Sequence, residues 1–279
     1  MDDALRDNRV LWDAWTRIHL GSAMYDVPSF LDGRHPIRLR DYERAEIGGV
    51  EGRTLLHLQC HFGLDTLSWA RLGATVTGAD FSPEAIGAAR ALATQTGLPA
   101  TFIESDLYRL PDVLGGAFDI VYTSRGVLNW LPDIVAWARV VAHFVRPGGL
   151  FYITEIHPVA SAFENEGVTP GELRLAYPYW SHAAPLTFEV NGSYADRDAP
   201  TDGLVEHGWN HSLGEIVTAL VDAGLRVEFL HEFDFVDWPE GYLVEGADGR
   251  WRLPADVPGS LPLFFSLRAS RPSDPNPGG

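Results

Sequence analysis

Short apolar runs alternate with longer amphipathic stretches through the central part of the chain. The short runs predict buried β-strands at residues 54–58, 75–79, 100–104, 118–123 and 150–155. Between them, apolar residues recur at the spacing of one helical face and predict helices at residues 64–72, 83–96 and 131–145. Because strands that alternate with helices pair in parallel, this pattern predicts a doubly wound α/β fold, a parallel sheet with helices on both faces.

Residue types at two element boundaries agree with this pattern. Ser82, Pro83 and Glu84 supply an N-cap, a first-turn proline and a first-turn acid for the helix that follows. The sequence VRPGG at residues 145–149 is expected to end a helix and turn the chain into the next strand.

The segment before the first strand is predicted to be helical. Residues 1–24 have an approximately helical apolar spacing, and a second short helix is expected at residues 37–47. The first helix either packs on the main domain or forms a lid, with Tyr25, Phe30 and Arg34 following it into a pocket.

A long segment after the fifth strand, residues 156–211, interrupts the alternation with many prolines, glycines and aromatic residues. Such a segment inside a domain is typical of a functional insertion. We interpret it as a substrate-covering insertion with a hairpin at residues 186–194. Regular structure then resumes, with a helix at residues 213–223 and strands at residues 225–232 and 263–269.

We divide the chain accordingly, and expect the polar, Pro/Gly-rich tail to be disordered. The predicted parts are a helical lid segment (1–50), a cofactor-binding core (51–157), the insertion (158–211), the C-terminal part of the core (212–269) and the tail (270–279).

Charge and composition exclude several kinds of function. The net charge of −17 argues against nucleic-acid binding, which normally needs a basic face. The chain has no lysine, which removes Schiff-base chemistry and a P-loop lysine, and a single cysteine, Cys60, which excludes an internal disulfide framework. With no long apolar run or signal peptide, we expect a cytoplasmic protein that does not bind membranes.

The first strand, turn, helix and second strand form a candidate cofactor site. Asp80, 17 positions after Gly63, ends the second strand, where a carboxylate can bind ribose hydroxyls; alternatively it caps the next helix. Asp106, after the third strand, can accept from an adenine amino group beside a backbone N–H such as that of Leu107. Phe81 either stacks on the adenine or belongs to the core.

The turn itself indicates which cofactor binds. Gln59 and His61 occupy two positions that are glycine in dinucleotide-binding loops, where side chains would crowd a pyrophosphate. S-adenosylmethionine contains no phosphate. The turn therefore favours this sulfonium cofactor over NAD or FAD.

The motifs LLHLQCHFG, VTGADFSPEAI, ESDLYRL and VRPGGLFYITEIHP, within residues 54–157, resemble those of class I S-adenosylmethionine-dependent methyltransferases. The resemblance implies a Rossmann-like, seven-stranded, mostly parallel sheet with an antiparallel last strand. It also implies that Gly63 lines the methionine part of the cofactor, Asp80 the ribose and Asp106 the adenine. Thr123 and Ser124 would pass beneath the sulfonium.

The catalytic residues are less sharply indicated. Methyl transfer needs a general base only where the acceptor must lose a proton. The candidates are Glu155, His157, His207, His211 and Tyr25, with His157 ranked first because Pro158 fixes the strand exit beside it. A metal site built from the three histidines lacks ligand spacing, and we predict none.

The acceptor is expected to be a small aromatic or N-heterocyclic metabolite, for example an indole, of bacterial secondary metabolism. TSRGVLNW follows the fourth strand where DNA amino-methyltransferases carry an N/D-P-P-Y-type motif, which again argues against nucleic acid. The residues expected to line the acceptor pocket are Trp15, Phe30, Asn129, Trp130, Tyr179, Trp180, Trp209 and His211.

Two other functions stay open on the same fold. An NAD-dependent oxidoreductase would share the sheet, and a non-catalytic protein would bind S-adenosylmethionine without transferring the methyl group. A homodimer is also compatible with the sequence.

Overall fold

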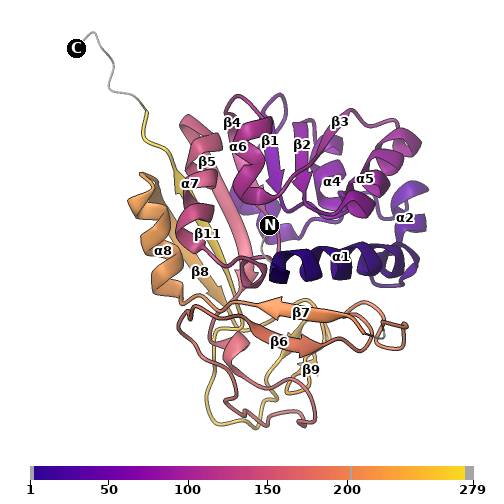
Figure 1. Cartoon of the computed structure of the whole chain (residues 1–279), viewed down its shortest axis with the longest axis vertical. Helices are drawn as coiled ribbons and strands as arrows, with labels where there is room; N and C mark the ends of the chain where they lie inside the picture. Colours follow the sequence, from indigo (N-terminus) through magenta and orange to yellow (C-terminus); the bar gives the residue numbers. More distant parts are fainter. Residues whose placement is uncertain (1–2, 202, 274–279) are drawn as a thin grey trace.

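A mixed seven-stranded sheet forms the centre of the molecule (Figure 1). The computed structural model describes residues 3–201 and 203–273, and in these the strand order is β3-β2-β1-β4-β5-β11-β8. The strands are β1 (Thr54–Leu58), β2 (Thr75–Asp80), β3 (Ala100–Glu104), β4 (Phe118–Thr123), β5 (Val145–Ile156), β8 (Arg226–Phe233) and β11 (Phe264–Ser270). The first five are parallel, and β11 is antiparallel to both β5 and β8, which confirms the expected sheet.

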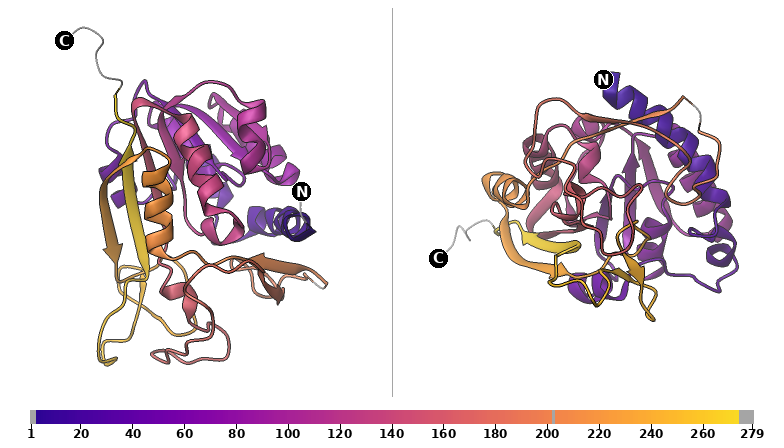
Figure 2. Two further views of the ribbon diagram at one scale, coloured as in Figure 1. Left: turned by 60° about the vertical axis from the view of Figure 1, so that its left-hand side comes forward. Right: turned by 90° about the horizontal axis from the view of Figure 1, so that it is seen from below.

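Helices cover both faces of this sheet (Figure 2). Side chains alternate along a strand, so Leu55 and Leu56 enter different apolar clusters. The cluster of Leu56 includes residues of α6 (Leu110–Val113), α7 (Ile134–Phe144) and α8 (Leu213–Asp222). The cluster of Leu55 includes residues of α3 (Asp41–Ile47) and α4 (Leu64–Arg71), and α5 (Pro83–Thr96) packs beside α4 in a third cluster.

The fifth strand begins earlier than predicted. Residues 145–149 belong to β5 instead of forming a turn before it. Phe118 pairs with Val145 but Ile120 pairs with Leu150, so the strand bulges there, with Gly148 at a φ of 73°. The Pro-Gly-Gly sequence therefore forms a bulge. The bulge accommodates the extra residues that β5 has, relative to β4, between these two paired positions.

The N-terminal segment contains one more helix than predicted. Helix α1 (Asp3–Gly21) crosses the carboxyl ends of the strands and packs against α5 (Figure 1). The unexpected α2 (Val27–Leu31) starts where the Asp26 carboxylate accepts from Ser29 N. Helix α3 begins at Asp41, later than the predicted residue 37.

The insertion forms a hairpin, but with a different second strand from the one predicted at residues 186–194. Strand β6 (Leu186–Glu189) pairs with β7 (Val205–Gly208), and β7 lies along α1. Asn8 of α1 determines this arrangement because its side chain bonds both backbone groups of His207, at 2.8 Å each. Helix α1, which lies outside the sheet, thus holds β7 in place beside β6. The turn residues of the insertion could not indicate this contact.

The other short elements lie at the ends of strands and in loops. They are η1 (Leu107–Arg109), η2 (Leu128–Trp130), η3 (Ala160–Ala162), β9 (Val244–Glu245) and β10 (Trp251–Arg252).

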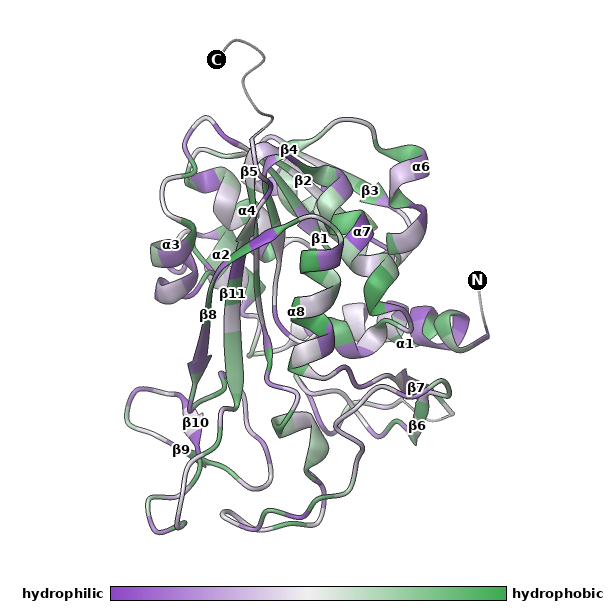
Figure 3. Cartoon of the chain, turned by 90° about the vertical axis from the view of Figure 1, so that its left-hand side faces the viewer, coloured by the Kyte–Doolittle hydropathy of each residue, from purple (hydrophilic) through white to green (hydrophobic). Residues whose placement is uncertain are grey.

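The last strand extends into the predicted tail. Ser270 ends β11, and the Arg271 guanidinium donates to the carbonyls of Ala142 and Val145, so the first residues of the tail are ordered. Residues 274–279 lie outside the described residues. Beside β11, the edge strand β8 mixes apolar residues with four polar ones, Arg226, Glu228, His231 and Glu232 (Figure 3), and charged side chains are typical of an edge open to water. None of the described helices is long and apolar enough to cross a membrane.

Substitution of Gly63, at the start of α4, tests how tightly this region is packed. A Cβ on Gly63 would lie 2.7 Å from the Phe102 ring, and its φ of 78° disfavours other residues. We expect Gly63→Ala to lower the free energy of unfolding by about 2–4 kcal/mol in urea denaturation. Gly97→Ala, with a φ of 64° and no atom within 4 Å, should lose only about 1 kcal/mol. Equal losses would contradict a packing role for Gly63.

Candidate functional site

The turn from β1 to α4 has the backbone of a glycine-rich loop although two of its residues carry side chains. Gln59, His61 and Gly63 have φ values of 56°, 51° and 78°. The turn is held by hydrogen bonds from Cys60 N to Ala79 O at 3.0 Å and from His61 N to the Asp80 carboxylate at 2.8 Å. Non-glycine residues in this conformation are uncommon and gather at functional sites.

A cavity of about 670 Å³ opens beside this turn, at the carboxyl ends of the parallel strands. Six of the nine residues predicted to bind the cofactor line it: Gln59, His61, Asp80, Phe81, Asp106 and Leu107. The sequence analysis did not single out the other lining residues, apart from Trp130: Leu5, Trp12, Ala79, Ser105, Tyr108, Leu110, Val127 and Leu131.

The charged groups on the wall of this cavity are both acidic. Asp80 is buried, which raises its pKa to about 6, although backbone N–H groups of Ser82 and His61 partly offset that effect. Asp106 caps the following turn by accepting from Tyr108 N at 2.8 Å. Burial also holds the pKa of His61 well below its usual value, so its ring is neutral. The wall contains no arginine.

The other three predicted cofactor residues are not part of the cavity wall. Gly63 packs against Phe102, and the Ser124 hydroxyl lies 3.0 Å from Nε2 of His57. Thr123 is fully buried and its hydroxyl has no partner. Their expected contacts with the methionine part and the sulfonium stay predictions.

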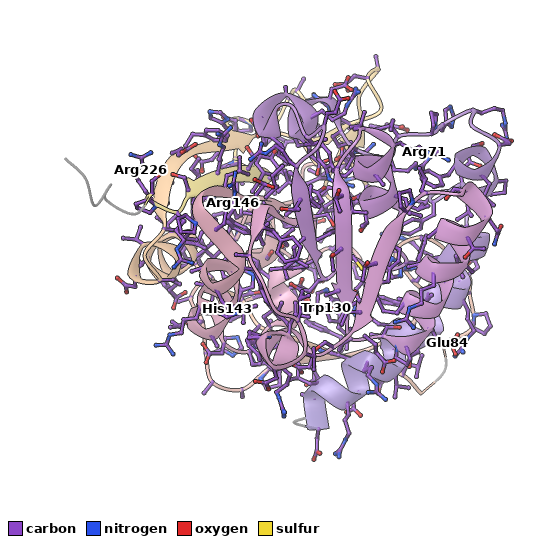
Figure 4. All side chains as sticks on the ribbon, turned by 90° about the horizontal axis from the view of Figure 1, so that it is seen from above. Arg71, Glu84, Trp130, His143, Arg146 and Arg226 are labelled. Carbon is purple, nitrogen blue, oxygen red and sulfur yellow. The ribbon has the colours of Figure 1, made fainter. Side chains whose placement is uncertain are left out.

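Aromatic side chains cover the cavity from the side of α1. Trp12 meets Trp130 with ring centroids 5.2 Å apart and His61 at 5.1 Å. In Figure 4, Trp130 lies towards the middle of the molecule, whereas Glu84 and Arg226 lie at its rim. The location of α1 is the one expected of a lid, and the three-residue spacing of Trp12 and Trp15 was the available signal for it.

Two predicted residues support this aromatic cover from behind. Trp15 donates its indole N–H to Gly192 O at 3.0 Å, which ties α1 to the insertion. Tyr25 packs on Phe62, and its hydroxyl is hydrogen-bonded to that of Tyr194. Burial raises the Tyr25 pKa to about 12, so this phenol keeps its proton at neutral pH and lacks the properties of a base.

A second cavity, of about 340 Å³, lies beyond the loop that follows β4. Three residues predicted for the acceptor pocket line it: Asn129, Trp209 and His211. Nε2 of His211 lies 2.7 Å from Leu131 O. Because a carbonyl only accepts, the proton must be on Nε2, and the buried Nδ1 is an acceptor without a partner. Burial lowers the pKa of His211, which favours this neutral form.

Glu155 also lines the second cavity, but its carboxylate is committed to the backbone. It accepts from the N–H groups of Gly126, Val127, Leu128 and Ile156 at 2.6–2.9 Å. These bonds hold the loop after β4. This differs from the prediction that Glu155 acts as a general base. Each of its carboxylate oxygens already accepts two backbone hydrogen bonds and is not free to take a proton from a substrate.

The other two predicted bases face away from both cavities. His157, ranked first, lies 2.9 Å from the Glu232 carboxylate of β8 because it follows β5 on the side of the antiparallel strands. His207 contacts Thr187 and Asp7. Among the described residues no three histidine, cysteine, aspartate or glutamate side chains gather as a metal site would require.

Three predicted acceptor residues also lie elsewhere. Phe30 is fully buried in the core beneath the Arg71 guanidinium. Trp180 is 71% exposed, and Tyr179 packs against it. Arg34, expected to enter the pocket, is exposed and pairs with Asp32. Residue type alone could not separate these aromatic side chains from pocket residues.

A buried ion cluster supports the loop after β4, and the sequence analysis missed it. Arg125 pairs with Glu43 at 2.8 Å and with Asp65 at 3.1 Å. Tyr122 donates to the same Glu43 at 2.7 Å. The partners come from α3, α4 and β4, so the cluster anchors the loop between the two cavities to three elements.

This sheet order, with a cavity at the carboxyl ends of its parallel strands, defines the class I methyltransferase fold. Residues 55–149 match the protein family described as "Methyltransferase domain". Residues 55–149 are therefore similar to a methyltransferase domain, as the motifs in this stretch indicated.

Relatives in this family are similar over part of their length. The ubiquinone biosynthesis O-methyltransferase of Photorhabdus laumondii is 33% identical over 123 residues, 44% of this chain and 50% of the relative. The protein of the same name from Vibrio parahaemolyticus is 32% identical over 123 residues, 44% of this chain and 52% of the relative. The chain thus spans about half the length of the curated relatives it matches.

Solved structures share the fold over most of the chain. An S-adenosylmethionine-dependent methyltransferase from Mesorhizobium loti has a TM-score of 0.56 and 24% identity, covering 86% of this chain and 100% of its own. The DhpI–SAH complex has a TM-score of 0.55 and 18% identity, with 98% of both chains covered. The [4+2]-cyclase SpnF has a TM-score of 0.51 and 16% identity, covering 84% and 80%.

The structural role of Glu155 leads to a prediction. We expect Glu155→Gln to lower the free energy of unfolding by about 2–4 kcal/mol, because an amide NH₂ would face backbone N–H donors. Chemical denaturation measures this loss. The control is Glu84→Gln, whose side chain is 48% exposed and which should change stability by less than about 0.5 kcal/mol. A fully stable but inactive Glu155→Gln variant would instead support a catalytic base.

Proposed function

We propose that this protein binds S-adenosylmethionine in the larger cavity and transfers its methyl group to a small aromatic acceptor bound in the second cavity. The observation that carries the proposal is the larger cavity itself, which has acidic groups at the expected ribose and adenine positions and no arginine among the described residues on its wall. An adenosine sulfonium fits such a wall. The pyrophosphate of NAD would meet the side chains of Gln59 and His61 at the turn, which disfavours an oxidoreductase.

The acceptor proposal is supported by the lining of the second cavity. Trp209 and the apolar side chains of Leu128 and Ile216 suit a flat ring, while Asn129 and His211 supply polar contacts. The relatives named O-methyltransferases favour an oxygen acceptor over the indole-type compound expected from the sequence. We therefore propose a hydroxylated aromatic compound.

In this proposal the acceptor oxygen attacks the cofactor's methyl carbon as the carbon–sulfur bond breaks, and the acceptor gives up its hydroxyl proton. His211 Nδ1 is the acceptor for that proton because its tautomer is fixed by Leu131 O. Alignment of the two ligands supplies much of the remaining acceleration. Residues 127–131 lie between the two cavities, so the proposal requires this loop to open and bring the acceptor oxygen into contact with the methyl carbon.

Isothermal titration of the protein with S-adenosylmethionine, S-adenosylhomocysteine and NAD tests the cofactor. We expect both sulfur compounds to bind and NAD not to bind. Binding of NAD alone would overturn the proposal. Because the fold also occurs in a protein titled a [4+2]-cyclase, transfer of a labelled methyl group to an acceptor is needed to establish the reaction.

Asp80 should contribute directly to this affinity. Removing its carboxylate in Asp80→Ala is expected to weaken S-adenosylmethionine binding by about 1–3 kcal/mol through lost hydrogen bonds. Hydroxyl donors prefer the ionised carboxylate, whose pKa is about 6 in the free protein, so wild-type affinity should fall as the pH decreases below 6. Titrations between pH 5 and 8 measure both effects. Asp112→Ala, at an exposed carboxylate, is the control and should match the wild type.

His211 should affect methyl transfer but not cofactor binding. With catechol and indole as probe acceptors, we expect transfer of labelled methyl to catechol, and a loss of about 100-fold in kcat/KM in His211→Phe. The affinity for S-adenosylmethionine should stay unchanged. His143→Phe, at an exposed histidine, is the matched control. Unchanged catechol methylation in His211→Phe would rule out the proposed proton acceptor.

A further inference from the structure

The Gln59 side chain is held in one orientation, with an unused oxygen. Its Nε2 donates to Val127 O at 3.2 Å. Because the carbonyl of Val127 can only accept, the amide nitrogen must face it and Oε1 must point the other way. That oxygen is buried and has no hydrogen-bond partner, although Gln59 lies on the wall of the larger cavity. A buried acceptor without a partner is unfavourable unless a ligand satisfies it.

The presence of glutamine here needs an explanation, since its backbone is in the left-handed region. Gln59 has a φ of 56°, where glycine would be free of strain. The side chain therefore comes with a conformational cost. The only hydrogen bond described for this side chain is the one to Val127 O, so the amide oxygen has no assigned role.

The surroundings of this oxygen favour a positive charge. Trp12 and Trp130 lie on the same cavity wall, and their ring faces attract cations. The neutral His61 and the carboxylate of Asp80 complete this end of the wall, and none of the lining residues carries a fixed positive charge. Together, the amide oxygen, the indole faces and the carboxylate favour a bound cation. They suit in particular a cation that has no hydrogen-bond donors of its own.

We propose that Gln59 Oε1, Trp12 and Trp130 form a subsite that recognises the positive charge of the sulfonium group and so distinguishes S-adenosylmethionine from its neutral product. This inference rests on the proposed function. The positively charged methyl and methylene groups beside the sulfur contact the amide oxygen through C–H···O interactions, and the indoles through cation–π attraction. After methyl transfer the sulfur is neutral, so these contacts weaken and favour release of S-adenosylhomocysteine.

The test compares two ligands that differ by one methyl group and one positive charge. Isothermal titration gives the ratio of the dissociation constants of S-adenosylhomocysteine and S-adenosylmethionine for each variant. In Gln59→Gly, whose backbone is compatible with the observed φ, we expect this ratio to fall about tenfold, because only S-adenosylmethionine loses a charge-assisted contact. In Trp12→Leu it should fall about threefold.

Asp112→Ala, at an exposed carboxylate that is not on the cavity wall, is the control, since it should leave both affinities and their ratio unchanged. A ratio that stays at the wild-type value in both Gln59→Gly and Trp12→Leu overturns the charge-recognition subsite while leaving the proposed cofactor intact. Absence of binding by both sulfur ligands to the wild type would instead refute the proposed function. Far-ultraviolet circular dichroism of each variant shows that a changed ratio does not come from unfolding.

Discussion

The site depends on one buried carboxylate. Asp80 accepts from His61 N at 2.8 Å and from Ser82 N at 2.9 Å, so a single side chain joins the turn after β1 to the start of α5. The Ser82 hydroxyl donates to Asp13 of α1, which connects the lid helix to the same point. Burial disfavours the charged form of Asp80, and the backbone donors compensate for part of that cost. Hydrogen bonds at Asp80 and Ser82 thus connect the turn, the second strand and α1.

The loop after β4 is the second element on which the site depends, because it separates the two cavities. Val127 and Trp130 face the larger cavity, whereas Asn129 faces the second one. The Glu155 carboxylate and the Arg125 ion cluster hold this loop in place. These contacts fix the position of the loop between the two cavities.

The cover of the site is assembled from segments far apart in the sequence. Asn8 bonds the backbone of His207, and Trp15 bonds that of Gly192, so α1 and the insertion form one layer (Figure 1). Each contact alone is modest, but together they place the indole of Trp12 on the wall of the larger cavity.

The parallel strands, their connecting helices and the residues at the strand ends follow from the amino-acid sequence, because period, caps and chain order are local properties. These local signals also pick out Gln59, Asp80 and Asp106, which line the larger cavity. What each polar side chain faces depends on how distant segments pack together. Glu155 meets four backbone donors and His157 meets a neighbouring strand, whereas Trp12 and His211 reach cavities, and these outcomes depend on long-range packing that no local pattern records.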